Sequence, residues 1–353
     1  MKRLTDEKMK FLHRGTAIPA HPLALKADRT LDERHQRALT RYYMDAGAGG
    51  IAIGVHSTQF EIRNPEFNLY EPVLRIASEE VDAAGLDRPF LKIAGVCGHL
   101  EQAEHEAQTA LSLGYDMVLL SMGGLGEMDE DGLLERTRRI AGIMPVFGFY
   151  LQPSVGGRIL SYDFWRRFAE IDNVHAIKTA PFNRYYTLDV VRAVCNSTRN
   201  DQIALYTGND DNIINDLLTT YRFEIDGKVV EKDIVGGLLG HWAVWTKRAV
   251  EIFNDIKEYQ ERTNLINKDW LTLNIQVTDA NAAFFDPSHQ FRGCISGIHE
   301  VLRRLGLMES IVCLSEHERL SPGQTDEIDR VHDAYPFLHD DDFVRENLEK
   351  WLG

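Results

Sequence analysis

The sequence predicts an α/β protein that folds as a TIM (β/α)8 barrel with a C-terminal helical region. From about residue 15 to residue 240, short apolar runs rich in Val, Ile and Ala alternate with longer amphipathic segments. Strands that alternate with helices pair in parallel, and continuous apolar runs indicate strands buried on both faces. Eight such units are present, which is the number at which a parallel sheet closes into a barrel.

The predicted strands are the apolar runs Thr16–Ala20, Gly50–Val55, Phe90–Val96, Met117–Ser121, Val146–Leu151, Ala176–Thr179, Ile203–Thr207 and Ile234–Leu239. The predicted helices between them are clearest at Leu31–Ala46, Leu100–Leu113, Asp131–Ile143, Tyr162–Ile171, Thr187–Asn196 and Asp211–Tyr221. Asp131 and Ser161 are N-cap candidates, because each stands just before an amphipathic run and carries an oxygen that can accept from the free N–H groups of a first turn.

An open, doubly wound sheet is the competing architecture. That fold carries a glycine-rich phosphate loop after its first strand, whereas the chain after Thr16–Ala20 continues His-Pro-Leu-Ala-Leu. The barrel is therefore favoured. The segment Arg222–Asp233 contains an Asp-Gly pair, which is typical of a tight turn, and we expect a small inserted hairpin there.

The strand signal stops beyond residue 240. Helical patterns follow at Trp242–Tyr259, Phe291–Leu305 and Asp342–Leu352, and Pro287 and Pro322 break the intervening chain. The sequence thus predicts two regions, a barrel over residues 1–240 and a helical region over residues 241–353.

Composition and charge limit the possible partners. The formal net charge of the 353-residue chain is −15, which argues against nucleic acid or an anionic membrane surface as the main partner. No run reaches the ~18 apolar residues of a membrane span. Residues 1–14 are charged throughout and lack the apolar stretch of a signal peptide, so we expect a cytoplasmic protein. The four cysteines form no CxxC pair, and we expect neither a metal site nor a cofactor.

Lys178 is the first candidate for chemistry, because it lies in the predicted sixth strand, in the segment His-Ala-Ile-Lys-Thr-Ala-Pro. Desolvation in a buried strand lowers the pKa of a lysine, and a neutral amine can condense with a ketone to give an iminium that acts as an electron sink. Two alternatives stay open from spacing alone. The ammonium can pair with a surface carboxylate, and Lys92 in the third strand is an equally plausible lysine.

Two further strand ends carry polar side chains. Tyr150 ends the fifth strand, where a hydroxyl that points into the barrel mouth can shuttle protons, although a packed barrel tyrosine is the commoner case. The second strand runs into Gly54-Val-His56-Ser57-Thr58, where adjacent hydroxyl and N–H groups in a tight loop can hold a carboxylate.

In combination, these motifs resemble the dihydrodipicolinate synthase / N-acetylneuraminate lyase superfamily of class I aldolase-type enzymes. The resemblance runs from about residue 15 to about residue 335, and its specific pair is Tyr150-Leu-Gln-Pro153 and Ile177-Lys178, whose tyrosine and lysine are 28 residues apart. Further matches in the same order are Ile18–Leu23, Gly50–Thr58, Ala94–Gly98, Gly114–Asp116, Tyr206–Asp210 and Gly236–Gly240.

The resemblance implies that Lys178 forms the imine and Tyr150 relays protons. It places His56 and Ser57 where the family has two loop threonines, so that Ser57 would hold the carboxylate of the keto acid, and Gly54 keeps the loop tight. Thr58 belongs to the same cradle. It also implies a homotetramer or homodimer.

Several positions depart from the synthase pattern. Residues 121–126 read Ser-Met-Gly-Gly-Leu-Gly and offer no tyrosine to a neighbouring subunit. Val155 stands where the synthases have an arginine for the second substrate, and Arg158 three residues later is the candidate replacement. Thr179 follows the lysine in place of an acidic residue.

The sequence therefore predicts a divergent Schiff-base lyase, aldolase or dehydratase that acts on pyruvate or another 2-keto acid, and not a true dihydrodipicolinate synthase. One alternative is a non-catalytic protein that binds keto acids. Another is a metal-dependent barrel lyase or hydrolase that uses His56, His99 and Asp210, although these residues lack a recognisable ligand spacing. The second substrate stays open, because such specificity depends on loop geometry.

Overall fold

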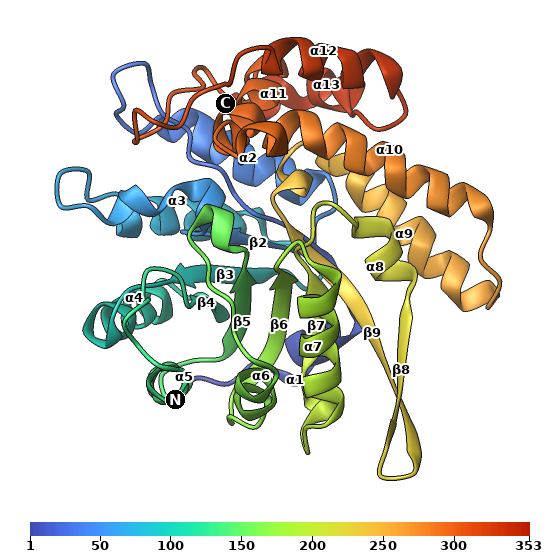
Figure 1. Cartoon of the computed structure of the whole chain (residues 1–353). Helices are drawn as coiled ribbons and strands as arrows, with labels where there is room; N and C mark the ends of the chain where they lie inside the picture. Colours follow the sequence, from blue (N-terminus) through green and yellow to red (C-terminus); the bar gives the residue numbers. More distant parts are fainter.

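The computed structural model describes residues 1–353 and shows a parallel barrel surrounded by helices (Figure 1). The strands are β1 (Ala17–Pro19), β2 (Gly50–Ile53), β3 (Leu91–Val96), β4 (Met117–Ser121), β5 (Val146–Leu151), β6 (Val174–Ala180), β7 (Ala204–Thr207), β8 (Thr220–Ile225) and β9 (Lys228–Leu239). The helices are α1 (Asp6–Arg14), α2 (Glu33–Asp45), α3 (Tyr70–Ala84), α4 (Leu100–Ser112), α5 (Glu130–Ala141), α6 (Tyr162–Ala169), α7 (Arg184–Cys195), α8 (Ile213–Leu218), α9 (Thr246–Arg262), α10 (Lys268–Phe285), α11 (Cys294–Arg304), α12 (Gln324–Ala334) and α13 (Asp341–Leu352). None of the helices combines the length and the apolar character needed to cross a bilayer.

Eight of the nine strands form the barrel, and all of them run parallel. Their order in the sheet is β1-β9-β7-β6-β5-β4-β3-β2. A parallel bridge between Ala20 and Ala52 joins the two ends of this order, beside β1 and in β2, and closes the barrel. The predicted TIM barrel is therefore confirmed. The ninth strand, β8, pairs antiparallel with the start of β9 around a turn at Asp226 and Gly227, both of which have positive φ. The hairpin expected in this segment is thus present.

The apolar core has two parts, one on each side of the barrel wall. A smaller cluster fills the barrel itself and includes Phe147, Phe149 and Tyr206. A larger cluster packs the outer face of the strands against the helices. At the amino-terminal end of the barrel, Leu12 of α1 belongs to the inner cluster and its carbonyl accepts a hydrogen bond from the Tyr206 hydroxyl at 2.8 Å. Helix α1 therefore closes that end of the barrel.

The predicted set of helices and one predicted N-cap need correction. The sequence patterns did not single out α1, α3, α10 and α12, which the structure contains. Ser161 is the N-cap of α6, as predicted, because its hydroxyl accepts from the Phe164 N–H. The N-cap of α5 is Asp129 and not Asp131, since the Asp129 carboxylate accepts from Gly132 N–H while Asp131 lies inside the first turn.

Only helices follow β9, as expected, and they pack onto the barrel. Figure 1 shows α10 to α13, in orange and red, gathered over one end of the barrel. Helix α10 contacts α8, α11 and α12, and α13 contacts α2. The buried ring of Trp351 in α13 lies 5.3 Å from that of Tyr42 in α2. The helical region is therefore joined to the barrel through a shared core.

Candidate active site

A small cavity of about 50 Å³ lies at the carboxyl ends of the strands. In a barrel of this kind the loops at this end build the active site. Residues from the strand ends line one side of the cavity, and the segment from α10 to α11 lines the other. The lining residues are Ala20, Val55, His56, Ser57, Phe149, Leu151, Gln152, Val155, Lys178, Ala180, Phe182, Gly208, Asp210, Gly240, Phe285, Phe291, Cys294 and Ile298.

Lys178 extends into this cavity from the middle of β6. Alternate residues of a strand face the same side, and Ala176 and Ala180, two residues before and after the lysine, belong to the cluster inside the barrel. The lysine is only 6% exposed, and its Nζ atom lies 4.4 Å from the centroid of the Phe149 ring without donating a hydrogen bond to any protein group. Burial lowers the pKa of Lys178, which favours the neutral amine.

Asp210 is the acidic group of the cavity. It follows β7 in the segment Gly-Asn-Asp, is 4% exposed, and accepts a hydrogen bond of 2.7 Å from the His241 N–H. Burial raises the pKa of Asp210, while the positive charge of Lys178 opposes that shift. No ion pair within 4.0 Å joins the two side chains, so the Lys178 amine stays free toward the cavity. From the sequence, Asp210 is a candidate only as a metal ligand, although its place at the end of a barrel strand is the signal that points to the cavity.

The loop after β2 is a tight turn, but only two of its four predicted substrate-binding residues line the cavity. His56 and Ser57 line the cavity. The Thr58 hydroxyl accepts from Gly54 N–H at 2.9 Å and donates to the His21 carbonyl at 2.7 Å, so it builds the turn and does not face the cavity. Gly54 has a φ of +77°, a conformation that favours glycine. The structure therefore places His56 and Ser57 beside Lys178, and Thr58 and Gly54 behind them.

The two cavity residues of the loop differ in their available chemistry. The Ser57 hydroxyl donates to the Ala20 carbonyl at 2.9 Å. Burial and the nearby charge of Lys178 lower the pKa of His56 to about 4, so its imidazole is neutral near pH 7. These residues begin a short 3-10 turn, His56–Thr58. The first N–H groups of a helical turn have no acceptor inside that turn, and they are suited to bind an anion.

The Tyr150 hydroxyl does not point into the barrel mouth, which its predicted role as a proton relay requires. In the pairing of β5 with β6, Phe149 stands opposite Lys178 and Tyr150 stands opposite Thr179. Tyr150 belongs to the outer core cluster, where its ring lies 5.0 Å from that of Trp165. Its hydroxyl accepts a long hydrogen bond of 3.4 Å from Leu160 N–H. Phe149 therefore occupies the inward position beside the lysine.

Arg158 also lies outside the cavity, contrary to its predicted role in substrate binding. One of its guanidinium nitrogens, Nη1, donates to the carbonyls of Leu125 and Met128 at 2.7 and 2.9 Å. It thus holds the loop after β4 and is not free to meet a substrate carboxylate in this conformation.

The competing lysine, Lys92, faces the outside of the barrel. Its Nζ atom donates to Asp82 at 2.6 Å and to Ser78 at 2.9 Å, and both partners lie on α3. Among the residues of the metal-dependent alternative, His99 is largely exposed and pairs with Glu127 at 3.4 Å, and it does not line the cavity. Lys178 is therefore the lysine in the cavity, and the three proposed ligands do not converge.

A larger polar cleft, about 620 Å³, opens beside the ends of β3 and β4, and Lys178 does not line it. Its lining includes an ion pair of Arg63 with Glu106, at 2.9 Å, and Arg63 also donates to the carbonyls of Gly54 and Gly95. This ion pair fixes the base of the loop that carries His56 and Ser57.

Comparison with known proteins extends the description of the fold. No protein-family model and no curated protein matches the chain. Among solved structures, dihydrodipicolinate synthase from Oceanobacillus iheyensis has 16% identity and a TM-score of 0.71, over 93% of this chain and 99% of that one. YagE, a prophage protein of the dihydrodipicolinic acid synthase family from E. coli K12, in complex with pyruvate, has 17% identity and a TM-score of 0.73, over 91% and 99%. CdNal from Clostridium difficile, in complex with mannosamine, has 16% identity and a TM-score of 0.70, over 91% and 99%. At these identities the similarity shows a common fold.

Proposed function

We propose that this protein is a Schiff-base-forming lyase or aldolase of the class I type that acts on pyruvate or another 2-keto acid, and a divergent member of the dihydrodipicolinate synthase / N-acetylneuraminate lyase superfamily. The observation that carries the proposal is the free, buried amine of Lys178 at the mouth of a barrel. Its lowered pKa supports nucleophilic attack. The fold shared with YagE, whose structure contains pyruvate, supports the keto acid as substrate.

In the proposed reaction the neutral Lys178 amine attacks the carbonyl carbon of the keto acid. A proton moves from nitrogen to oxygen to give a neutral carbinolamine. Asp210 in its acid form then donates a proton to the carbinolamine hydroxyl, water leaves, and a protonated imine and the Asp210 carboxylate remain. The substrate carboxylate is held at the start of the turn His56–Thr58 by the first N–H groups of the turn and by the Ser57 hydroxyl, which turns to it from the Ala20 carbonyl. Because Asp210 faces the same cavity with a raised pKa, it is the group suited to exchange protons near neutral pH.

The imine makes the next carbon, C3, acidic. The C3–H bond breaks, its proton passes to the Asp210 carboxylate, and the electron pair moves to the nitrogen to give a neutral enamine. That enamine is the nucleophile for carbon–carbon bond formation, and the reverse sequence describes cleavage. Tyr150 has no part in this scheme, since its hydroxyl lies on the outer face of the barrel.

Two measurements test the proposal without knowledge of the second substrate. Borohydride should trap pyruvate covalently on Lys178, detected by peptide mass spectrometry, and pyruvate methyl protons should exchange with D2O at a catalysed rate, detected by NMR. Both should be lost in Lys178→Ala and kept in the matched control Lys92→Ala. Trapping on another lysine, or exchange that persists in Lys178→Ala, would refute the assignment.

A second candidate function is binding of keto acids without turnover. The observation that favours it is the absence of any tyrosine among the residues that line the cavity. A binding protein would be stabilised by keto acids against thermal unfolding but would catalyse no C3 exchange.

The division at residue 240 and the assembly as a homodimer or homotetramer also stay predictions, and size-exclusion chromatography with light scattering tests the assembly.

A further inference from the structure

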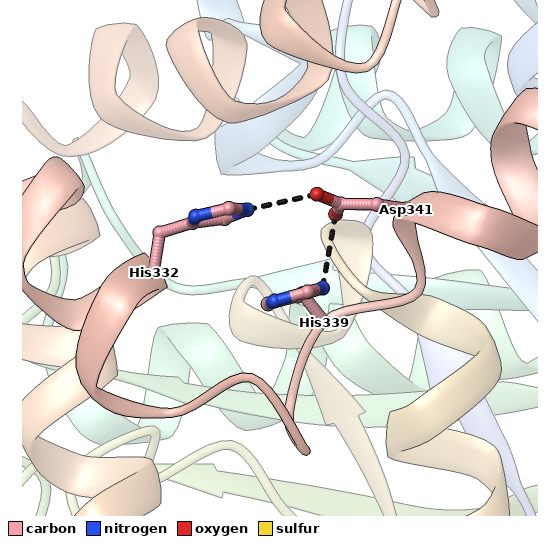
Figure 2. A group of neighbouring side chains, drawn as sticks. All are labelled: His332, His339 and Asp341. Carbon is pink, nitrogen blue, oxygen red and sulfur yellow. Dashed lines mark hydrogen bonds and ion pairs between the residues drawn. The ribbon is translucent and has the colours of Figure 1, made fainter.

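Two histidines and an aspartate meet on the C-terminal helices, away from the lysine cavity. His332 lies near the end of α12, His339 in the connection that follows, and Asp341 at the start of α13. Figure 2 shows both imidazole rings directed at the same carboxylate, with His332 Nε2 at 2.8 Å and His339 Nδ1 at 3.3 Å from its two oxygens. The two rings are nearly parallel, with centroids 4.3 Å apart and an interplanar angle of 9°.

The cluster is open to solvent on one side and enclosed on the other. The side chains of His332, His339 and Asp341 are 39%, 20% and 31% exposed, so that an ion can reach all three. The indole of Trp245, just before α9, lies 6.4 Å from the His332 ring and 6.0 Å from the His339 ring.

A second carboxylate lies beside the cluster. One ring nitrogen of His332, Nδ1, lies 3.8 Å from a carboxylate oxygen of Asp333, whose side chain is exposed. When Nε2 of His332 binds a metal ion, the ring carries its proton on Nδ1, and rotation of the Asp333 side chain would bring the carboxylate into hydrogen-bond range. A carboxylate behind a metal-binding histidine is a recurrent arrangement, because it fixes the ring and raises its basicity.

We propose that His332, His339 and Asp341 form a zinc-binding site with one position left for water. The candidate ligand atoms already lie within 4.8 Å of one another. Tetrahedral Zn²⁺ at about 2.0–2.1 Å from each ligand needs separations of roughly 3.3 Å. Rotation of the two partly exposed imidazoles out of their parallel stacking would supply that contraction and direct both nitrogens at one ion. Imidazole nitrogen favours Zn²⁺ over Mg²⁺ and Ca²⁺, which prefer oxygen ligands.

A bound ion would join the end of α12 to the start of α13 beside Trp245, the residue before α9. The site would therefore act structurally, by fixing these parts of the helical region to one another. The zinc site is independent of the proposed chemistry at Lys178, so an experiment that refutes one of these two proposals leaves the other standing.

The test uses the full-length, tag-free chain and Zn²⁺ itself. Equilibrium dialysis and competition with a chromophoric chelator should give one zinc ion per chain. Zinc at 100-fold above its Kd should raise the Tm by roughly 4 °C. His332→Ala and His339→Ala should each lose binding by at least 100-fold, and Asp333→Asn by about 10-fold. Mg²⁺ at the same concentration should leave the Tm unchanged.

Two matched variants serve as controls. His317→Ala removes an exposed histidine on the same region, and His35→Ala removes the histidine of the other cluster of metal-ligating side chains, Asp32, His35 and Glu309. Both should bind zinc as the wild type does. Absence of stoichiometric binding, binding that survives His332→Ala and His339→Ala, loss of binding in either control, or an equal response to Mg²⁺ would overturn the proposal. Circular dichroism of each variant, compared with the wild type, identifies any loss of fold.

Discussion

Replacement of Tyr150 by phenylalanine separates a packing role from a catalytic one. Tyr150→Phe keeps the ring that lies against Trp165 and removes only the hydroxyl. That hydroxyl makes a single hydrogen bond, from Leu160 N–H, whose length of 3.4 Å is beyond the usual range. We therefore expect a loss of about 1 kcal/mol in the free energy of unfolding.

The expected effect on chemistry is much smaller than for a proton relay. Loss of a general acid or base slows catalysis by typically about 10²–10⁴-fold. Because the Tyr150 hydroxyl faces away from Lys178, the rates of borohydride trapping and of C3 exchange should stay within roughly threefold of the wild type, whereas Asp210→Asn should slow C3 exchange by about 10²-fold or more. Urea unfolding and NMR measure the two effects on the same samples. A slowing of about 100-fold or more in a folded Tyr150→Phe protein would refute the geometric argument.

Three further perturbations follow from the same geometry. Trapping of pyruvate should increase with pH, with a midpoint below the ordinary lysine range, because burial lowers the pKa of Lys178. Asp210→Asn should move that midpoint lower still, since it removes the negative charge that stabilises the Lys178 ammonium. A pH series of trapping rates checks both effects, and an upward shift of the midpoint in Asp210→Asn would contradict this reasoning. Gly54→Ala should cost about 1–2 kcal/mol in urea unfolding, because φ at this position is +77°, and an unchanged midpoint would count against a strained turn. Arg158→Ala should speed hydrogen exchange in residues 122–128 and leave pyruvate trapping within about threefold; a tenfold rise in the pyruvate concentration required would instead indicate a substrate contact.

The barrel could be predicted because its information is local. Continuous apolar runs mark buried parallel strands, and six of the helices between them carry clear amphipathic patterns. The position of Lys178 in a buried strand could be predicted for the same reason, since it stands inside one of these apolar runs. The helices α1 and α3 escaped prediction although their faces are amphipathic, and only α1 lies outside the alternation of strands and helices.

The orientation of Tyr150 could not be predicted, because it depends on register. Spacing of 28 residues to Lys178 fits the family pattern. However, the pairing of β5 with β6 shifts between Val146 and Phe147, and Phe149 then stands opposite the lysine. A shift of one residue exchanges the two faces of a strand. The cover of the cavity by Phe285 and Phe291 was equally hidden, because it joins segments more than 100 residues from Lys178.

That cover has a consequence for the order in which the molecule folds. Contacts between distant segments form late, because closing a long loop costs entropy before the contact stabilises anything. The cavity is complete only when α10 and α11 dock on the barrel, and the backbone of Leu314 then bonds to Gln59 across 255 residues. A refolding chain should therefore gain barrel structure first and the proposed keto-acid binding later. During that interval Lys178 is more exposed to water, so its pKa lies closer to the ordinary lysine value, and the neutral nucleophile is favoured fully only after the last step of folding.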